Sequence, residues 1–317
     1  MAEKVVEKPN VELPDVEMNI YSPKDPVEAT VVENEICTAS SSPNFVRHIT
    51  FDISGTKLQN NVVPGQAFGI LPPGQNEKGK PHKLRLYSTA SPTYGEDGEG
   101  KYMSTTVKRV LEEFGDDHKL YTGVCSNYLC DLVPGDKVKM TGPSGRRFVL
   151  PQNPEKYNYV FFATGTGIAP FRAMVKQLLN DGHDKEIILV FGCPYRTDYL
   201  YPDLFHELEE QYSNFTYLKN VSREDRRPDG SKKYVQTSIV DDKEILDPVL
   251  KQSNTLLYMC GLEGMETGIY ELLAKQGYME YLKLKENKLS STDPNEWGWE
   301  DLKKGVKASD RTFIEVY

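Results

Sequence analysis

The sequence predicts two domains, an antiparallel barrel or sandwich followed by an α/β domain built around a parallel sheet. Three observations support this prediction. The chain has 317 residues, which is too long for one typical core and fits two domains. Glycine and proline punctuate short segments up to about residue 150, as in antiparallel β structure. Beyond residue 154, apolar segments alternate with helical patterns, which indicates repeated βαβ units.

Residues 1–28 form an N-terminal segment that is rich in Glu, Lys and Pro and shows little apolar periodicity. This composition predicts a flexible or surface-draped arm with little function of its own. The segment lacks the apolar core of a signal peptide, and its acidic residues argue against a retained transit peptide. We therefore expect a protein that is made where it acts or has already been processed.

Residues 29–153 are expected to form the antiparallel domain. Apolar side chains at Phe45, Ile49, Phe51 and Ile53 alternate with polar ones, as on a strand with one buried face. Turn residues follow at two positions, Pro64-Gly65 and Pro134-Gly135-Asp136.

Residues 154–317 are expected to form the α/β domain, with the boundary at Pro151 to Pro154. A helix is predicted over residues 171–179. The Lys-rich segment from Lys283 to Lys304 is predicted only as a helix plus a loop. Its two tryptophans, Trp297 and Trp299, are expected to anchor the segment by packing. Apolar strands are predicted over residues 159–163, 187–191, 215–221 and 255–260.

Composition narrows the functional classes. Hydrophobic residues make up 38% of the chain and charged residues 27%, which is typical of a soluble globular protein. No apolar run approaches the roughly 20 residues needed to cross a bilayer, so no transmembrane segment is expected. The net charge of -9, from 38 Lys plus Arg against 47 Asp plus Glu, argues against nucleic acid as the main ligand.

The cysteines and histidines predict neither a disulfide framework nor a metal site. Five cysteines at irregular spacings fit a reducing compartment. Cys125 and Cys130 have no third and fourth thiol at the spacing of an iron–sulfur or zinc site. The five histidines form no metal constellation, and Cys37 and Cys193 are expected to be small buried residues.

The strand Arg85-Leu86-Tyr87-Ser88 is the first candidate ligand site. Because side chains alternate along a strand, Arg85 and Tyr87 point the same way and could contact one ligand. A cation for phosphate, a flat aromatic ring and a short hydroxyl together suit a flavin. The alternative is an exposed cross-strand pair with no ligand.

The turn Gly165-Thr166-Gly167-Ile168-Ala169-Pro170 is the second candidate site, since it follows an apolar strand and precedes a helix. Glycines let the backbone approach a pyrophosphate, and the helix N-terminus supplies free amide donors. Pro170 fits the first helical turn, where a missing N–H costs nothing. A tight strand-to-helix turn without a ligand is the alternative.

A third cluster combines a hydroxyl, two cations and a phenol: Ser222, Arg223, Lys232 and Tyr234. These groups could surround a 2′-phosphate while Tyr234 stacks on adenine, which favours NADP over NAD. One charged hydrogen bond, about 1.5–3 kcal/mol, corresponds to roughly ten- to a hundredfold discrimination. A basic surface loop is the alternative.

Six blocks of the sequence, in order, resemble the motifs of plant-type ferredoxin–NADP reductases. The resemblance runs from about Asn19 to Tyr317. It implies a FAD-binding antiparallel β-barrel followed by an NADP-binding α/β parallel-sheet domain, with the flavin and the nicotinamide meeting between them. The blocks are Lys80–Ser88, Gly123–Cys130, Gly165–Arg172, Val221–Glu224, Met259–Leu262 and Glu315–Tyr317.

The resemblance implies roles for residues around FAD. Arg85 would pair with the pyrophosphate, Tyr87 would stack on one isoalloxazine face, and Tyr317 would cover the other face. Ser88 would form a hydrogen bond near the hydride-accepting nitrogen. The other flavin-binding positions would be Leu86, Lys108, Val124, Cys125 and Ser126.

The family usually places an aromatic residue at the FAD adenine, and this chain departs from that pattern. It has Glu112 at that position, so Phe114 or Tyr121 would have to substitute.

The resemblance also implies the NADP site and the catalytic residues. Cys260 would lie beside the reacting carbon, Glu315 would accept a hydrogen bond or relay protons, and Tyr317 would move aside for the nicotinamide. Together with Ser88 these are the expected catalytic residues. The expected NADP-binding residues are Thr166, Gly167, Ser222, Arg223, Lys232, Tyr234, Gln236, Gly261 and Leu262.

The implied activity is electron transfer through FAD between NADP(H), which exchanges a hydride, and ferredoxin or flavodoxin, which carry single electrons. These acidic carriers would dock near Lys80, Lys83 and Arg146. We expect a monomer in a bacterial cytoplasm or, as a processed protein, in the plastid stroma.

Two other functions stay open at this point. One is an NADPH-dependent flavin reductase component that serves an oxygenase or another protein acceptor. The other is a non-catalytic flavin-binding docking subunit, against which the presence of Ser88, Cys260, Glu315 and Tyr317 argues.

Overall fold

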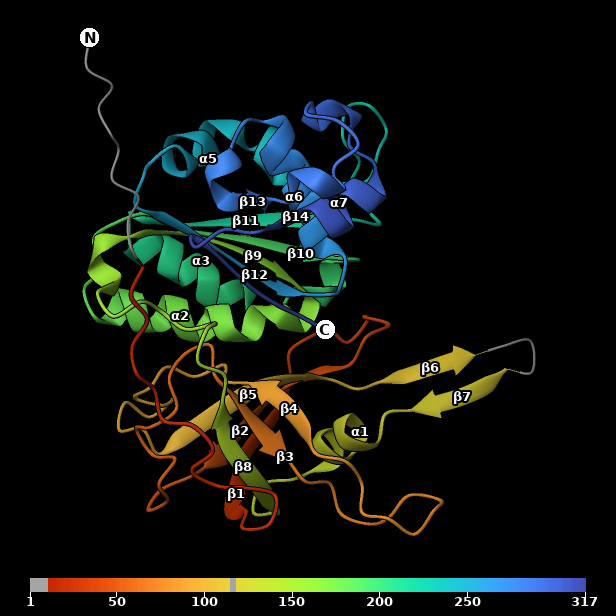
Figure 1. Cartoon of the computed structure of the whole chain (residues 1–317). Coiled ribbons are helices and arrows are strands. Elements are labelled where there is room, and N and C mark those ends of the chain that lie inside the picture. Colours follow the sequence, from red (N-terminus) through yellow and green to blue (C-terminus); the bar gives the residue numbers. More distant parts are fainter. Residues whose placement is uncertain (1–10, 115–117) are drawn as a thin grey trace.

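A computed structural model describes residues 11–114 and 118–317, which form a β-barrel and a parallel-sheet domain (Figure 1). The first ten residues of the expected N-terminal arm lie outside the described part. β1 begins at Val27, so the barrel takes in the last two residues of that arm.

The first domain is a six-stranded antiparallel sheet in the order β4-β3-β8-β1-β2-β5. Its edge strands meet, because Thr89 bridges Thr105 and the Thr105 hydroxyl donates to the Ser88 carbonyl at 2.8 Å. The sheet therefore closes into a barrel. Its strands are β1 (Val27–Ile36), β2 (Val46–Asp52), β3 (Ala67–Ile70), β4 (Arg85–Ser88), β5 (Tyr102–Lys108) and β8 (Lys137–Ser144).

Strand β2 is buried on both faces, which the expected alternation does not capture. Ile49 and Phe51 point into the barrel core, whereas Val46 packs into the core of the second domain. Phe45 precedes the strand and is 49% exposed, so its expected burial is wrong. The second domain covers the outer face of β2, and this contact could not be read from the alternation alone.

A hairpin, β6 (Leu111–Phe114) and β7 (Lys119–Thr122), extends away from the barrel and is followed by α1 (Val124–Asp131) (Figure 1). Glu112 stands at the position of the family's adenine-binding aromatic residue, and Phe114 is one of its possible substitutes. The side chains of both residues lie outside the described part.

The second domain contains a five-stranded parallel sheet in the order β11-β10-β9-β12-β15. Strand β11 coincides with the predicted range 215–221, and the other predicted strands are extended by one or two residues. The strands are β9 (Asn158–Thr164), β10 (Ile187–Cys193), β11 (Phe215–Val221), β12 (Thr255–Gly261) and β15 (Thr312–Val316).

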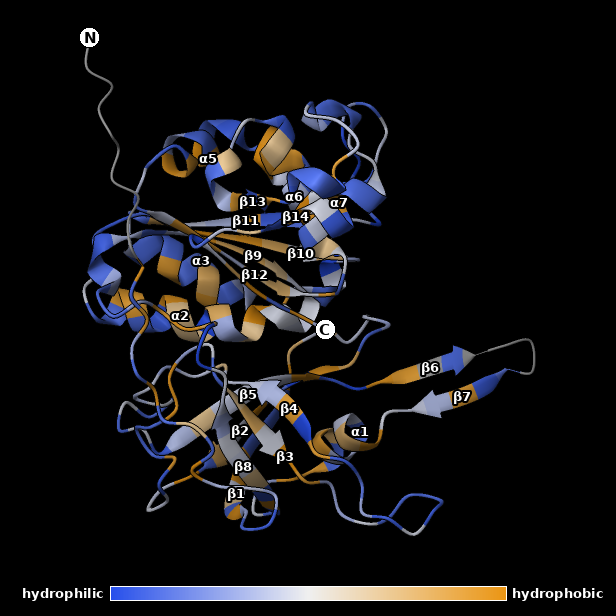
Figure 2. Cartoon of the chain, in the orientation of Figure 1, coloured by the Kyte–Doolittle hydropathy of each residue, from blue (hydrophilic) through white to orange (hydrophobic). Residues whose placement is uncertain are grey.

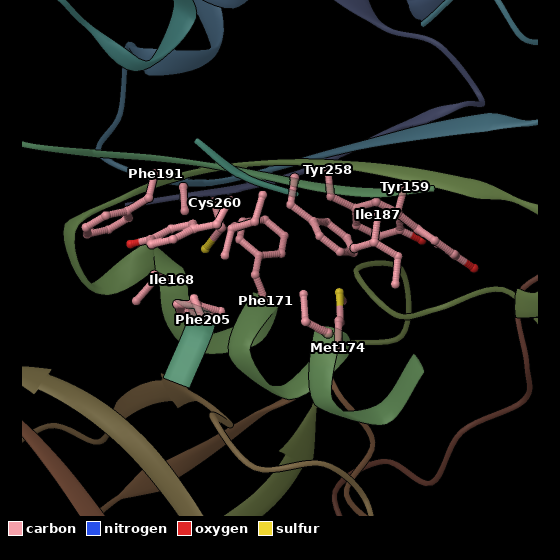
Figure 3. Packing of buried hydrophobic residues seen from close by; sticks show 14 of the residues in the cluster. Tyr159, Ile168, Phe171, Met174, Ile187, Phe191, Phe205, Tyr258 and Cys260 are labelled. Carbon is pink, nitrogen blue, oxygen red and sulfur yellow. The ribbon is translucent and has the colours of Figure 1, made fainter. Parts of the chain in front are cut away.

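Helices cover both faces of this sheet, whose strands are largely apolar (Figure 2). Phe171 and Met174 of α2 point at Tyr159 and Tyr258 of the sheet (Figure 3). The rings of Phe161 and Phe171 stack with their centroids 4.8 Å apart. One face carries α2 (Ile168–Asn180) and α3 (Pro202–Gln211). The other carries α4 (Ser238–Asp241), α5 (Lys243–Leu250), α6 (Met265–Lys275) and α7 (Trp299–Gly305).

The strand order reverses between β9 and β12, which lie side by side although 90 residues of chain separate the end of one from the start of the other. The chain after β9 moves toward β10 and β11, and it then returns to add β12 and β15 on the other side. Ligands of open α/β sheets bind outside the carboxyl ends of the strands at such a switch point. This edge of the sheet is therefore where a nucleotide site is expected.

The segment Lys283–Lys304 begins in β13 (Leu282–Leu284) and ends in α7, and the strand that follows it, β14 (Val306–Ala308), pairs antiparallel with β13. The predicted helix and loop are present, and the two-stranded sheet that closes the segment was not anticipated. Trp297 is 6% exposed and packs in the core, as expected, whereas Trp299 is 55% exposed.

The two domains meet through a buried polar cluster. Glu96 of the barrel domain accepts from Arg172 and, at 2.7 Å, from Lys176, both on α2. Tyr201 shares hydrogen bonds with His48 at 2.9 Å and with Thr106 at 2.6 Å. The outer face of the barrel is thereby joined to the face of the parallel sheet that carries α2 and α3.

Residues 11–22, here called the strap, run along both domains. The Gln66 side chain donates to the Glu17 carbonyl at 2.9 Å, and Tyr21 pairs with Gly142, so the strap is bonded to the barrel. Gln152 N–H donates to the Glu12 carbonyl at 2.9 Å, and Val11 packs on the core of the second domain. In the described part of the chain no helix is both long and apolar enough to cross a bilayer.

Candidate active site

A cavity of about 440 Å³ opens on the barrel beside β4 and the N-terminus of α1. Its volume lies in the range of small-molecule sites, roughly 300–1,000 Å³. Five residues predicted for FAD line it: Arg85, Tyr87, Val124, Cys125 and Ser126. Six further residues complete the wall: Asn76, His82, Lys83, Val110, Tyr121 and Gly123.

The cavity is suited to an anionic ligand. Arg85 is exposed and, in the described structure, its guanidinium bonds only the neighbouring Leu84 carbonyl, at 3.2 Å. The first N–H groups of a helix have no intrahelical acceptor, and those of α1 begin at this wall. The Ser126 hydroxyl accepts from Val110 N–H at 3.2 Å, which fixes the loop that leads into the helix.

Tyr87 forms the flat part of the cavity wall. Burial raises its pKa, with a further contribution from the adjacent Cys125, so the phenol stays neutral. Arg85 and Tyr87 share one face of β4, as the alternation predicts. Leu86 and Ser88 are not part of the cavity wall: Leu86 is 56% exposed, and the backbone carbonyl of Ser88 is bonded to β5. Lys108 is exposed at the end of β5 and is not part of the cavity wall.

At the switch point, the turn η2 (Gly165–Gly167) packs tightly on the end of β12. A Cβ at Gly167 would lie 2.2 Å from the Cys260 carbonyl oxygen. Gly261 has a φ of 148°, and a Cβ there would lie 2.0 Å from the Thr164 hydroxyl. That hydroxyl accepts from Leu262 N–H at 3.1 Å. Glycine is therefore required at both positions for the two strand ends to meet.

Cys260, Glu315 and Tyr317 lie together at this edge, because β12 pairs in register with β15 and sets Cys260 opposite Glu315. Burial, followed by the nearby Glu315, raises the pKa of the Cys260 thiol. Burial also raises the pKa of Glu315. In the described part of the chain, Glu315 Oε2 is buried without a hydrogen-bond partner, so a donor from a ligand would satisfy it.

Tyr317 covers the nucleotide turn. Its phenol shares a 2.5 Å hydrogen bond with the Thr166 hydroxyl. The residue is 58% exposed, and partial burial, followed by the nearby Cys260, raises the pKa of Tyr317. The ring thus rests over the turn through one bond that a ligand could replace.

The barrel and the sheet edge approach each other at β5. Turn η2 lies against β5, the strand whose Thr105 is bonded to the Ser88 carbonyl. The turn with Thr166 and the strand with Ser88 therefore contact the same strand of the barrel. This arrangement brings the two predicted ligand sites to one junction between the domains.

The third cluster gathers after β11. Arg223 is exposed, and its guanidinium donates to the Tyr195 hydroxyl at 2.8 Å. Lys232 and Tyr234 lie beyond the turn that returns toward Arg226, and Tyr234 is 45% exposed. Ser222 is half-buried and donates weakly to the Cys193 carbonyl at 3.4 Å. Gln236 packs against α6, where a Cβ at Gly268 would lie 2.8 Å from its amide nitrogen.

Sequence reasoning assigned no role to Asn76, Gly123, His82 or Tyr195. His82 lies within the block that identified Lys80 and Lys83, so a signal for it existed. Tyr195 follows β10 and meets Arg223 only through the fold, so no local pattern could have found it. The five cysteines, all in the described part, are free thiols. The described residues contain no His, Cys, Asp and Glu group suited to a metal ion.

Comparison with known proteins places the chain in a family. The model for an oxidoreductase NAD-binding domain matches residues 161–271. A ferredoxin–NADP reductase of a Spirulina species is 36% identical over 310 residues, which cover 96% of this chain and 99% of the relative. The Thermosynechococcus vestitus ferredoxin–NADP reductase is 40% identical over 281 residues, covering 85% and 72%. The chloroplastic leaf isozyme 1 of Arabidopsis thaliana is 35% identical, covering 99% and 83%.

Solved structures agree on the fold. The ferredoxin-NADP+ reductase of Plasmodium falciparum superimposes with a TM-score of 0.68 at 23% identity, covering 94% of this chain and 99% of that one. The same protein with 2′P-AMP gives a TM-score of 0.70 at 21% identity, covering 96% and 100%. With relatives above one-third identity along nearly the whole chain, this protein belongs to the ferredoxin–NADP reductase family.

Proposed function

We propose that the barrel cavity binds FAD and that the carboxyl edge of the parallel sheet binds NADP(H). Arg85 and the N-terminus of α1 would hold the FAD pyrophosphate, and Tyr87 would lie against the isoalloxazine. The cavity wall supports Tyr121 as the aromatic residue for adenine in place of Glu112. Leu86, Ser88 and Lys108 would contact FAD from outside this wall.

The NADP(H) site is proposed on either side of the switch point. Gly167, Gly261 and Leu262 would approach the pyrophosphate and the nicotinamide, and Thr166 would contact them after Tyr317 moves. The 2′-phosphate and the adenine would be bound by Ser222, Arg223, Lys232, Tyr234 and Gln236.

The observation that carries this proposal is the buried, unpartnered Glu315 Oε2 beside Cys260, at the edge that faces β5. A partly buried carboxyl group with a raised pKa can hold a proton and orient a ligand amide. Ser88 would offer its hydroxyl from the barrel side. Tyr317 would exclude water until the nicotinamide takes its place.

The protein transfers electrons between NADP(H) and ferredoxin. Bound FAD supplies the chemistry that joins a two-electron hydride donor to a one-electron carrier. The protein residues contribute geometry, because hydride transfer requires the two rings to be held at near-contact distance.

Ferredoxin or flavodoxin would dock on the barrel side. Lys80, Lys83 and Arg146 are all exposed there and would offer local positive potential on a chain of net charge -9. Steering depends on local potential, so an acidic protein can still attract an acidic carrier. The cyanobacterial and chloroplastic relatives support a role in a bacterial cytoplasm or the plastid stroma. A monomer remains our prediction.

Ferredoxin dependence is the decisive test. The FAD-loaded protein should reduce cytochrome c with NADPH much faster when ferredoxin is added, and the gain should shrink as salt rises. Reduction of ferricyanide alone would not separate this activity from that of an oxygenase reductase component. Cytochrome c reduction that does not depend on ferredoxin would refute ferredoxin as the electron carrier of this protein. Retention of FAD without bleaching by NADPH would favour the non-catalytic subunit.

A further inference from the structure

The loop after β10 holds the loop after β11 in a fixed backbone geometry. Ser222 N–H donates to the Cys193 carbonyl at 2.9 Å, and Arg223 N–H donates to the Pro194 carbonyl at 3.0 Å. Arg196 adds a second point of attachment, because its N–H and its guanidinium both donate to Glu224 at 2.9 Å. The backbone that carries Arg223 is therefore fixed from the neighbouring strand's loop.

Tyr195 fixes the side chain of Arg223 as well. Its hydroxyl accepts from Arg223 Nη1 at 2.8 Å, and the guanidinium carbon lies 5.3 Å from the centre of its ring. The hydrogen bond to Tyr195 raises the pKa of Arg223, with smaller contributions from Asp198 and Tyr234. A guanidinium has five N–H donors, so one bond leaves the others free for an anion.

The other arginines of this region are engaged differently. Arg227 bonds the Asp241 carboxylate at 2.9 and 3.0 Å, and Arg196 is paired with Glu224 and Asp225. Arg226 donates to the backbone carbonyls of Ser222 and Asp225. Arg223 is held by a neutral phenol, which restrains the side chain without neutralising it. A cation restrained in this way loses less entropy when it binds a phosphate.

Resting on the NADP(H) site proposed above, we propose that Tyr195 is a positioning residue that sets the preference for NADP(H) over NAD(H) by holding Arg223 ready for the 2′-phosphate. Tyr195 itself would not have to touch the phosphate. Its effect would pass through Arg223, and the two residues should therefore be energetically coupled.

The test is a double-mutant cycle on the FAD-loaded protein, with 2′P-AMP and 5′-AMP titrated by the change in flavin absorbance. Tyr195→Phe should weaken 2′P-AMP about three- to tenfold, as for one restraining hydrogen bond, and leave 5′-AMP unchanged. Arg223→Ala should weaken 2′P-AMP by about ten- to a hundredfold. Tyr195→Phe should then have no further effect in the Arg223→Ala background.

Tyr212→Phe, at the end of α3 in the same domain, is the matched control and should leave both ligands unaffected. Unchanged or tighter 2′P-AMP binding in Tyr195→Phe would overturn the proposal, since the phenol would then be inert or would hold Arg223 away. Equal weakening of both ligands would also overturn it, as the role would then be structural. If the unaltered protein binds 2′P-AMP no more tightly than 5′-AMP, the NADP(H) site itself is refuted.

Discussion

Glu315 and Cys260 place a carboxyl group and a thiol on adjacent strands, where Cys260 is buried and one carboxyl oxygen of Glu315, Oε2, is shielded from water. A thiol with a raised pKa stays protonated, so Cys260 contributes its small size rather than nucleophilicity. Glu315 is the titratable member of the pair.

Glu315→Gln should lower turnover with NADPH by about tenfold or more, as for the loss of one hydrogen bond to a charged group. It should also change stability with pH. Because the pKa of Glu315 is raised above its usual value of 4.5, its contribution to stability is full below that value and is lost as pH rises. The free energy of unfolding of Glu315→Gln, minus that of the unaltered protein, should therefore be larger at pH 8 than at pH 5.

Urea unfolding at the two pH values measures this difference, and Glu263→Gln on the exposed neighbouring loop is the control. If the stability difference between Glu315→Gln and the unaltered protein is the same at both pH values, the pKa of Glu315 is not raised by burial.

Tyr317→Ser should reduce the preference for NADPH over NADH by on the order of tenfold, because the ring over η2 no longer competes with the nicotinamide. Steady-state kcat/KM for both nucleotides measures it. Thr166→Val, which removes the 2.5 Å hydrogen bond and keeps the ring, should shift the preference less and in the same direction. An unchanged preference in Tyr317→Ser would be evidence against competition between the Tyr317 ring and the nicotinamide.

At the scale of elements, the nucleotide turn depends on the contact of two backbones. Gly167→Ala would place a Cβ 2.2 Å from the Cys260 carbonyl, and neither backbone can yield as a flexible side chain would. We expect a loss of stability of about 1–3 kcal/mol or more. Binding of NADP+, whose pyrophosphate and nicotinamide would lie at this turn, should be weakened while FAD is retained. Thermal unfolding and flavin difference spectra measure the two effects.

Gly298→Ala is the matched control, since a Cβ there would meet only Asp301 Oδ2, at 3.7 Å. Wild-type binding of NADP+ by Gly167→Ala would show that the close contact of η2 and β12 is not needed for the site.

Much of the fold could be predicted at this scale because strands and helices leave local patterns. Apolar runs such as Phe215–Val221 and the glycines around Thr166 carry their own signals. The burial of both faces of β2 and the pair of Tyr195 with Arg223 are long-range contacts without a local signature. Arg85 and Tyr87 were predicted correctly to share a face because alternation on a strand is a local rule.

At the scale of the whole molecule, the domain interface is held by charges that are mostly shielded from water. Burial favours the neutral acid at Glu96, yet Arg172 and then Lys176 hold its pKa well below the usual value of 4.5. Burial and Arg172 lower the pKa of His48 to about 3, so this histidine is neutral beside Glu96 at pH 7. Both groups therefore stabilise the interface above their usual pKa values and lose that effect in acid.

Glu96→Gln should lower the free energy of unfolding by on the order of 3–5 kcal/mol at pH 7, because Arg172 would keep a buried charge without its carboxylate.

His48→Gln tests the contribution of His48 to the interface. Between pH 6.5 and 5, the unaltered protein should lose up to about 1.4 kcal/mol per pH unit through His48, and His48→Gln should remove this part.

Urea unfolding at pH 7.5, 6 and 5 measures both effects, with His118→Gln on the exposed hairpin as the control. Parallel stability curves for the unaltered protein and His48→Gln would exclude a buried neutral histidine at the interface.

The strap of residues 11–22 has a mechanical consequence. Two domains joined only by one connecting chain can rotate relative to each other about that chain. The strap is bonded to the barrel at Glu17 and to Gln152 of the connecting chain at Glu12, and its Val11 packs on the core of the second domain, so it forms a second link between the domains. A second link apart from the connecting chain limits relative rotation of the domains to the single line that joins the two links. Severing the strap should release the other rotations and allow the distance between the two ligand sites to fluctuate.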